Sequence, residues 1–414
     1  MTRCLHRTLD CGVEFAAEVL PDRRTVALEL RVLSGLADEP PHQLGLAHLV
    51  EETIDKGTQR RDGRALSDAF DALGAQRASW TGRECIGFTC VCLPPQLQPV
   101  LELFAEMLRT PTFPDEACRV AVELAAQDLK SLEDDPQELA DKLLTRQAYG
   151  PWLGRHALGE ASTLANIGAA DIRKHWSTYF EAGRMQVAMA GPVDAERVMD
   201  SLERLFEGFG GSSPAGRALY PVEFNPVHTH QHKELEQEQI GFCFPGVART
   251  DPQFPVQQVL LAILSDGMSS RLFTEVREKL GLAYSVSAWH ENPRGAGMIH
   301  LHASTTPERC DRTYATLLRE VDRLGEDVTE AERLRAVNAI VARTETRGDI
   351  TRAHGAELAN DLFHFGRPVP LEEKLEAVRR VTIADLKRYL AEHPRDRLCV
   401  VTLGPKQLDP AGRQ

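Results

Sequence analysis

The sequence predicts an α+β fold built from two similar domains, each with a mainly antiparallel sheet and helices on one face. Three observations lead to this prediction. The chain has 414 residues, which is long for a single hydrophobic core. A segment rich in Gly, Ser and Pro divides it almost equally, and the two halves end in similar patterns. Strands and long helices mix within each half, without the regular alternation that is typical of a parallel sheet.

The composition is that of an ordinary globular protein, with 42% hydrophobic and 26% charged residues. No stretch approaches the roughly 20 apolar residues of a membrane helix, and the first residues lack the apolar core of a signal peptide. We therefore expect a cytoplasmic protein that does not bind membranes. A net charge of −13, with no long basic run, argues against nucleic-acid binding. Nine scattered cysteines without a C-x-x-C pair indicate reduced thiols rather than disulfides.

The dividing segment at positions 206–220 has the composition of a linker. It predicts an N-terminal domain over residues 1–208, a linker over 209–222 and a C-terminal domain over 223–414. Each predicted domain then has about 200 residues, a common size for a single domain.

The ends of the two halves resemble each other. In each half an Ala-Asp pair, at Asp171 and at Asp385, opens a short helix that leads into an apolar strand. Gly-Pro closes both strands, beginning at Gly191 and at Gly404. We expect each Asp to be a helix N-cap, and the shared order predicts a duplicated unit.

Two strands and two helices are expected between residues 25 and 132. Residues 25–33 alternate between apolar and polar as a half-buried strand does, and residues 86–93 form a second strand. Residues 97–109 and 115–132 have the apolar periodicity of amphipathic helices. The mixture is that of a sheet covered by helices.

The most informative stretch is GLAHLVEETIDKGT at positions 45–58. On a helix, His48, Glu51 and Glu52 lie at i, i+3 and i+4 and share one face. The H-x-x-E-H motif of inverted zinc peptidases uses this geometry, with two His binding zinc and the Glu activating water. By itself, H-x-x-E-E is common on solvated helices.

The neighbouring residues make this stretch resemble the motif of the M16 (insulinase-like) peptidase family, since Gly45, Ala47 and His48 precede it and Gly57-Thr58 follow it. The resemblance implies two domains of the LuxS/MPP-like metallohydrolase type. It also implies a zinc ion, held in the family by both motif histidines and a Glu from a later helix.

This sequence departs from the family pattern at three positions. Glu52 replaces the second His, Asp128 stands where the third ligand falls, and Ala121 replaces a helper Glu. A shell of His48, Glu52 and Asp128 would carry two negative charges, and Glu51 would add a third nearby. Such an oxygen-rich shell favours harder cations over zinc. We therefore expect a degenerate site in which bound zinc is doubtful or absent.

The second M16 signature is intact in GMSSRLFTEVREKLGLAYS at positions 267–285. The family's Arg and Tyr, seven residues apart, fall on Arg277 and Tyr284. The resemblance implies that this pair reaches the metal centre of an opposing half. There an Arg can hold the substrate carbonyl, and a Tyr O–H can stabilise an oxyanion.

Two further stretches have both a functional and an ordinary interpretation. Residues 73–81, with Ala78, Ser79 and Trp80, resemble the family's edge strand, which pairs with extended substrate peptides. An ordinary edge strand remains the alternative. The histidines at positions 228, 230 and 232 alternate, and we expect a solvent-facing strand rather than a metal site.

Together these features are typical of the half-size bacterial M16B type, whose chains dimerise around a chamber for peptides. A damaged first signature and an intact second one predict a metallopeptidase subunit that supplies Arg277 and Tyr284 to an H-x-x-E-H partner. A homodimer remains possible in this scheme. One alternative is an autonomous endopeptidase with His48, Glu52 and Asp128 as ligands and Glu51 as base. Another is a non-catalytic peptide-binding or assembly protein.

Overall fold

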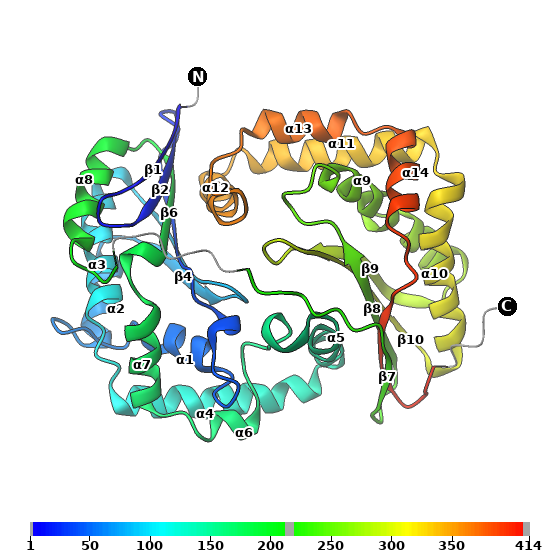
Figure 1. Ribbon diagram of the computed structural model, residues 1–414, viewed down its shortest axis with the longest axis horizontal. Helices are drawn as coiled ribbons and strands as arrows, with labels where there is room; N and C mark the ends of the chain where they lie inside the picture. Colours follow the sequence, from blue (N-terminus) through cyan, green and yellow to red (C-terminus); the bar gives the residue numbers. More distant parts are fainter. Residues whose placement is uncertain (1–2, 212–218, 409–414) are drawn as a thin grey trace. The chain divides into compact units, whose positions relative to one another are not determined.

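The computed structural model describes residues 3–211 and 219–408 (Figure 1). Residues 212–218 of the predicted linker lie outside the described residues. Contacts divide the chain into two compact units. One unit comprises Met1–Ser131, Arg155–Tyr220 and Arg347–Val369, and the other comprises Leu132–Gly154, Pro221–Thr346 and Pro370–Gln414. Each unit therefore includes one segment from the opposite half of the sequence.

The first unit contains a six-stranded sheet in the order β1-β2-β6-β3-β5-β4. The pairs are antiparallel except β2 with β6. The predicted strands at 25–33 and 86–93 are β3 and β5, which are neighbours in the interior of this sheet. The strands are β1 (Arg3–Thr8), β2 (Glu14–Val19), β3 (Val26–Val32), β4 (Gln76–Thr81), β5 (Ile86–Cys92) and β6 (Met185–Gly191).

The second unit contains a five-stranded sheet in the order β7-β11-β8-β10-β9, with β7 parallel to β11. The five strands of this sheet have the same spatial order and the same directions as β2 to β6 of the first sheet. The two equivalent orders are β2-β6-β3-β5-β4 and β7-β11-β8-β10-β9. This agreement is what a duplicated unit produces. The strands are β7 (His228–His232), β8 (Glu238–Gly246), β9 (Ala283–Glu291), β10 (Gly297–Thr305) and β11 (Cys399–Gly404).

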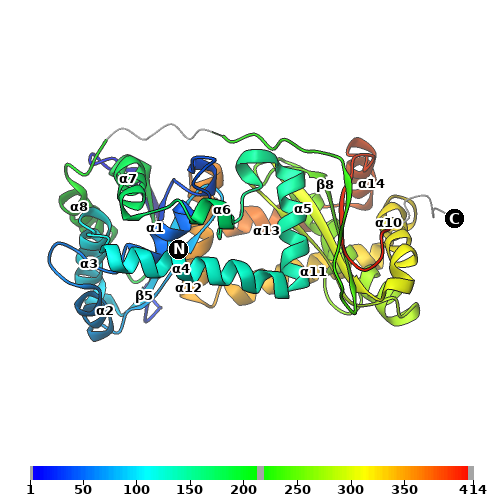
Figure 2. The same cartoon turned by 90° about the horizontal axis from the view of Figure 1, so that it is seen from below.

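Helices cover one face of the first sheet, where alternate strand residues such as Phe15 and Val187 enter the core. In this layer α3 and α8 lie side by side (Figure 2). The opposite face receives α12 (Thr351–Phe365), whose Leu358 and Leu362 pack on Ala16. The other helices are α1 (Leu46–Thr53), α2 (Gly63–Ala72), α3 (Leu97–Arg109), α4 (Asp115–Ser131), α6 (Ala161–Leu164), α7 (Ala169–Tyr179) and α8 (Ala195–Phe206).

The second sheet is covered in the same way, and α5 (Pro136–Leu153) packs against β8 and β11. A Cβ atom on Gly241 of β8 would lie 3.4 Å from the Leu144 side chain, so the helix approaches closely there. The other helices are α9 (Phe254–Ser265), α10 (Cys310–Asp327), α11 (Glu330–Arg347), α13 (Leu371–Arg379) and α14 (Ile383–Glu392). The predicted fold class is confirmed, and each sheet has an additional helix on its second face.

The N-cap prediction for Asp171 and Asp385 is wrong. Both helices begin earlier, so each Asp lies at the third helical position, after the N-caps Gly168 and Thr382. The backbone N–H of each N-cap donates to the Asp carboxylate at 2.9 Å. This is the capping-box arrangement, in which a side chain in the first turn reaches back to the N-cap. The two equivalent helices thus share their start.

The helices predicted over 97–109 and 115–132 are α3 and α4, and α4 is followed by a 3-10 turn at Leu132–Asp134. Among the described helices, none is long and apolar enough to cross a membrane.

Candidate functional site

The start of the helix that carries the altered motif is hydrogen-bonded to a buried carboxyl group. Gly45, with a φ of 98°, is the N-cap of α1. A glycine adopts this left-handed conformation without steric cost. Glu39 Oε1 accepts hydrogen bonds from the backbone N–H groups of Gly45 at 3.2 Å and Ala47 at 2.8 Å. Glu39 therefore satisfies donors that a helix start leaves without intrahelical partners.

The Glu39 residue is only 1% exposed. Burial raises its pKa to about 8, against the opposing effects of its two backbone hydrogen bonds and the charge of Arg155. Arg155 Nη1 donates to the carbonyl oxygens of Leu36, Ala37 and Glu39, so it fixes the loop that leads to α1. The start of the motif helix is thus held from two directions.

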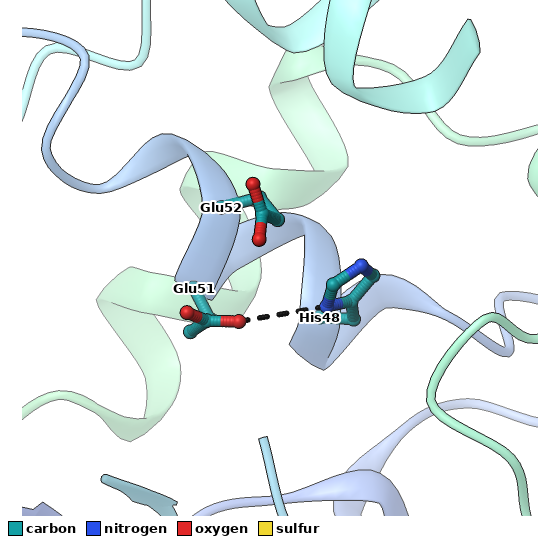
Figure 3. Close-up of side chains that lie close together, drawn as sticks. All are labelled: His48, Glu51 and Glu52. Atoms are coloured by element: carbon teal, nitrogen blue, oxygen red, sulfur yellow. Dashed lines mark ion pairs between the residues drawn. The ribbon is translucent and has the colours of Figure 1, made fainter. Parts of the chain in front are cut away.

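His48, Glu51 and Glu52 project from one stretch of α1, as the helical spacing predicts (Figure 3). Each offers a ligand atom, and these atoms all lie within 4.8 Å of one another. Glu51 Oε2 lies 3.5 Å from His48 Nδ1 and accepts a hydrogen bond from Thr81 Oγ1 at 3.3 Å. Glu51 is therefore held between α1 and the edge strand β4.

Burial alone would lower the pKa of the His48 imidazole. The hydrogen bond and charge of Glu51, together with the charges of Glu52 and Asp128, outweigh this effect and raise the pKa. Protonation and metal binding compete for the same nitrogen lone pair. The acidic surroundings therefore stabilise the protonated imidazole of His48.

The residues do not fit the zinc ion of the M16 motif. They provide one imidazole, His48, where the motif has two. Asp128 lies on α4, which packs against α1, but within residues 3–211 and 219–408 it does not join the group that surrounds His48. Zinc sites are built mainly from Cys thiolates, imidazoles and a few carboxylates at about 2.0–2.3 Å. We therefore derive no metal-dependent step for this chain.

An edge strand is present within residues 73–81, since β4 (Gln76–Thr81) lies at the end of its sheet. The pairing of this strand with a substrate peptide stays a prediction. A pocket of about 380 Å³ opens beside it, and Glu51, Ala78 and Ser79 are among its lining residues. Trp80 is not among them, because its ring covers Gly87 of β5. Arg77 and Asp55 form an ion pair of 2.9 Å in the pocket lining.

Arg277 and Tyr284 come together in the second unit. Arg277 lies on a π-helical turn, Phe273–Lys279. This conformation is rare in proteins as a whole, but where it occurs it is often at a functional site. Arg277 Cζ lies 4.6 Å from the centroid of the Tyr284 ring, yet Tyr284 is 78% exposed. Ser285 pairs with Ser304 and Ala283 pairs with Thr305, which leaves Tyr284 as the extra residue of a β-bulge. Bulges of this kind redirect a side chain.

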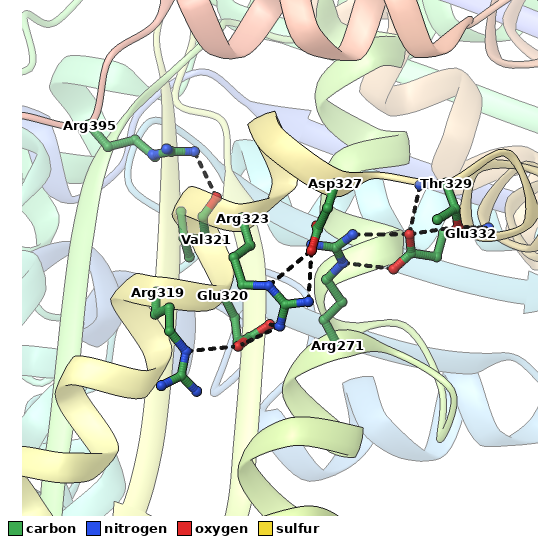
Figure 4. A network of polar contacts seen from close by, with 9 residues as sticks. All are labelled: Arg271, Arg319, Glu320, Val321, Arg323, Asp327, Thr329, Glu332 and Arg395. Carbon is green, nitrogen blue, oxygen red and sulfur yellow. Dashed lines mark hydrogen bonds and ion pairs between the residues drawn. The ribbon is translucent and has the colours of Figure 1, made fainter.

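A polar network anchors the start of the segment that bears Arg277 (Figure 4). Arg271 is 7% exposed, and its guanidinium donates to Asp327 at 2.7 Å and to Glu332 at 2.7 and 3.0 Å. Arg323 donates to the same Asp327 and to the buried Glu320. The segment is thereby tied to α10 and α11.

A second pocket, of about 390 Å³, adjoins Tyr284 within the same unit. It lies between the start of α5, the chain that enters β8, and the first residues of β9. Its lining residues are Asp135, Pro136, Gln137, Leu235, Glu236, Gln237, Gln239, Tyr284, Ser285 and Ser304.

Sequence reasoning did not identify Glu39, Thr81 or Arg271 as supports of these sites. An acidic residue before a Gly that opens a helix was the one available signal for Glu39. The three histidines at 228–232 lie on the edge strand β7, where His230 Nδ1 is 2.9 Å from Thr402 Oγ1. Across the part of the chain that the structure describes, they do not form a metal-binding group.

Comparisons with known proteins cover almost the whole chain. The family profile described as Insulinase (Peptidase family M16) matches residues 14–160, and the profile described as Peptidase M16 inactive domain matches residues 166–340. An uncharacterized zinc protease of Rickettsia bellii is 27% identical over 91% of both chains. The probable mitochondrial-processing peptidase subunit beta of Arabidopsis thaliana is 24% identical over 97% of this chain and 78% of its own.

Solved structures share the fold. A peptidase M16 inactive domain from Pseudomonas fluorescens superimposes with a TM-score of 0.89 at 20% identity, covering 98% of this chain and 99% of its own. A protease from Helicobacter pylori gives a TM-score of 0.89 at 17% identity, covering 97% of this chain and all of its own.

Proposed function

Because the chain belongs to the M16 peptidase family, we propose that it is the partner subunit of a metallopeptidase and supplies Arg277 and Tyr284 to a zinc-bearing chain. In this scheme the zinc-bearing chain carries an H-x-x-E-H motif, and the substrate is a peptide held in an enclosed chamber. The single observation that carries the proposal is the exposure of Tyr284 on a β-bulge, with Arg277 against its ring.

An aromatic ring that is 78% exposed gains little from packing in its own chain. The Tyr284 hydroxyl and the Arg277 guanidinium are both hydrogen-bond donors. Two adjacent donors suit a carbonyl oxygen that becomes negative during hydrolysis, since charge-assisted hydrogen bonds strengthen as charge develops.

The N-terminal half of the chain supports a complex in which one subunit binds the metal and the other binds the substrate carbonyl. His48 faces Glu51 in an ion pair, and the second imidazole of the motif is absent because position 52 is Glu. A chain of this kind contributes to hydrolysis most directly by completing another chain's site. One relative is itself named as a subunit of a processing peptidase, and the profile that matches residues 166–340 is described as an inactive domain.

The test is a reconstitution of this chain with an H-x-x-E-H relative encoded in the same genome, followed by a peptidase assay. Tyr284→Phe retains the ring beside Arg277 and removes the O–H donor. We expect it to reduce kcat of the pair by about 10²–10³-fold, as loss of one oxyanion donor does. Glu51→Gln in this chain is the matched control and should leave activity unchanged.

Three outcomes would contradict the proposal. The first is loss of activity in Glu51→Gln, which would assign chemistry to this chain's own motif. The second is full activity in Tyr284→Phe. The third is a pair that binds peptides but cleaves none, which would favour a binding or assembly role.

A further inference from the structure

Two buried threonines are hydrogen-bonded to the segment that leads to Tyr284. Thr305 is the last residue of β10, and Thr313 lies near the start of α10. Thr305 Oγ1 lies 2.6 Å from the carbonyl oxygen of Leu282 and 3.1 Å from Thr313 Oγ1. Because a carbonyl oxygen only accepts, Thr305 is the donor to Leu282, and Thr313 is then the donor to Thr305. The two hydroxyls form a hydrogen-bonded chain from α10 to Leu282.

Leu282 connects this chain with both Arg277 and Tyr284. Its backbone N–H donates to the carbonyl oxygen of Val276 at 2.8 Å, and Val276 directly precedes Arg277. Its own carbonyl group, two residues before Tyr284, accepts from Thr305. Leu282 and Val276 are both buried, and hydrogen bonds in such an environment are stronger than in water. The position of Leu282 therefore fixes the backbone on both sides of the pair.

The same threonine lies at the bulge that exposes Tyr284. Ser304 pairs with Ser285 and Thr305 pairs with Ala283, so the register shifts between Ser304 and Thr305. A bulge disrupts the ladder locally, so other contacts have to fix the backbone there. Thr305 provides two such contacts, its pairing with Ala283 and its hydroxyl bond to the residue before Ala283.

A further hydrogen bond to this loop lies at the surface. The Arg309 guanidinium donates to the carbonyl oxygen of Gly281 in an exposed position. Because water can replace an exposed hydrogen bond, the net contribution of this one is small. Loss of a buried hydrogen bond leaves polar groups without partners and costs more. The buried hydroxyl of Thr305 is therefore the stronger restraint on the loop.

We propose that Thr305, supported by Thr313, is a positioning residue that keeps the Tyr284 ring against Arg277. Thr305 acts through the backbone of Leu282. Removing its hydroxyl takes the donor from the Leu282 carbonyl and the acceptor from Thr313, so the loop has to shift to satisfy both groups. Any effect on hydrolysis rests on the proposed function, whereas the orientation of the ring is a property of the free chain.

The test replaces Tyr284 by fluorotyrosine in the purified full chain and records the fluorine NMR resonance. The chemical shift of an aromatic fluorine responds to the charge and the solvent beside the ring. Arg277→Ala removes the guanidinium from the ring and supplies the reference position for a lost contact. Thr305→Val retains the shape of the side chain without its hydroxyl, and we expect it to move the resonance toward that reference.

Two matched variants separate positioning from a general loss of stability. Thr305→Ser restores the hydroxyl and should return the resonance to its natural position. Thr402→Val removes another buried hydroxyl from the same sheet, one that lies 2.9 Å from His230 Nδ1. Thr402 is on β11, which two strands separate from β9, so this variant should leave the resonance unchanged.

Thr313→Val gives a second measurement that leaves Thr305 in place. Without Thr313 as its donor, the Thr305 hydroxyl is no longer directed toward Leu282, so we expect a smaller shift in the same direction. Circular dichroism checks that each variant is folded. An unmoved resonance in the folded valine variants of Thr305 and Thr313, or an equal shift in Thr402→Val, would overturn the positioning role.

Cleavage by the reconstituted pair tests the consequence for hydrolysis. Thr305→Val should lower kcat by about 10²-fold, as a displacement of about 1 Å at a reacting site does, and Thr305→Ser should recover most of the loss. A moved resonance together with full activity of Tyr284→Phe would retain the positioning role and reject the proposed function. Loss of cleavage in Tyr284→Phe with an unmoved resonance in Thr305→Val would do the reverse.

Discussion

The guanidinium of Arg277 lies against the ring of Tyr284, with its Cζ 4.6 Å from the ring centroid, although the two residues belong to different elements. Arg277 comes from a π-helical turn and Tyr284 from the bulge that begins β9. The same guanidinium lies 4.8 Å from the ring of Phe273. The pair is therefore preorganised while the Tyr284 side chain stays exposed.

We expect Arg277→Ala to lower the free energy of unfolding by no more than about 2 kcal/mol, because each of its two cation–π contacts contributes about 0.5–1 kcal/mol. Urea denaturation followed by circular dichroism measures this value. A small change means that loss of activity in a reconstituted pair reflects chemistry rather than unfolding. A loss of several kcal/mol would show that the contact is mainly structural.

Arg271→Ala should have a much larger effect. Its side chain is 8% exposed and bridges Asp327 and Glu332, and removal of one partner of a buried ion pair costs about 3–5 kcal/mol. Because Asp327 is 44% exposed, we expect the lower end of this range. Arg343→Ala is the matched control, since its pair with Asp266 is exposed and should contribute less than about 1 kcal/mol. Equal effects of the two substitutions would contradict this reasoning.

Restoring the motif should restore zinc affinity. We expect the double variant Glu52→His, Asp128→Glu to bind zinc at least about tenfold more tightly than the natural chain, because a second imidazole suits zinc better than a carboxylate. Competition with a chromophoric chelator measures the affinity. Adding His48→Ala should remove the gain. Identical affinities of the natural chain and the double variant would refute the donor-set argument.

The buried Glu39 predicts a pH dependence of stability. Burial raises its folded-state pKa to about 8, above the value of about 4.5 in the unfolded chain. The folded state therefore binds the proton more tightly. This group's contribution to stability is fully present below the unfolded pKa and is lost as the pH rises through the folded pKa.

Between these limits the slope is up to about 1.4 kcal/mol per pH unit for one proton. We expect the difference in unfolding free energy between the natural chain and Glu39→Gln to change over this window and to be constant above it. Urea denaturation at a series of pH values measures the difference. A difference that does not vary with pH would exclude a raised pKa.

The helix α12 should be essential for the first unit. Leu362 is fully buried against the second face of the first sheet, and Leu→Ala at such positions costs about 2–5 kcal/mol. Ile350→Ala, just before the same helix, is the control, because Ile350 is 55% exposed and should change stability by less than about 0.5 kcal/mol. A negligible effect of Leu362→Ala would mean that α12 is dispensable there.

The α+β class, and the strands and helices with clear periodicity, could be predicted from the order of the residues alone. The residue types also indicated which chemistry each motif could support. The pattern at residues 97–109 matches α3 because one apolar face per turn is a local property. The spacing of His48, Glu51 and Glu52 guaranteed a shared face for the same reason. The loss of the second imidazole is visible in the residue types alone.

Other features of the sites depend on how distant parts of the chain pack together. Contacts between residues far apart in the chain decide three features. These are the distance between Asp128 and His48, the hydrogen bonds of the buried Glu39 at the start of α1, and the position of α12 on the first sheet. The exposure of Tyr284 depends on a β-bulge, which is a property of pairing between β9 and β10. Local periodicity does not encode which strand residue is skipped, because this choice follows from the packing of both strands together.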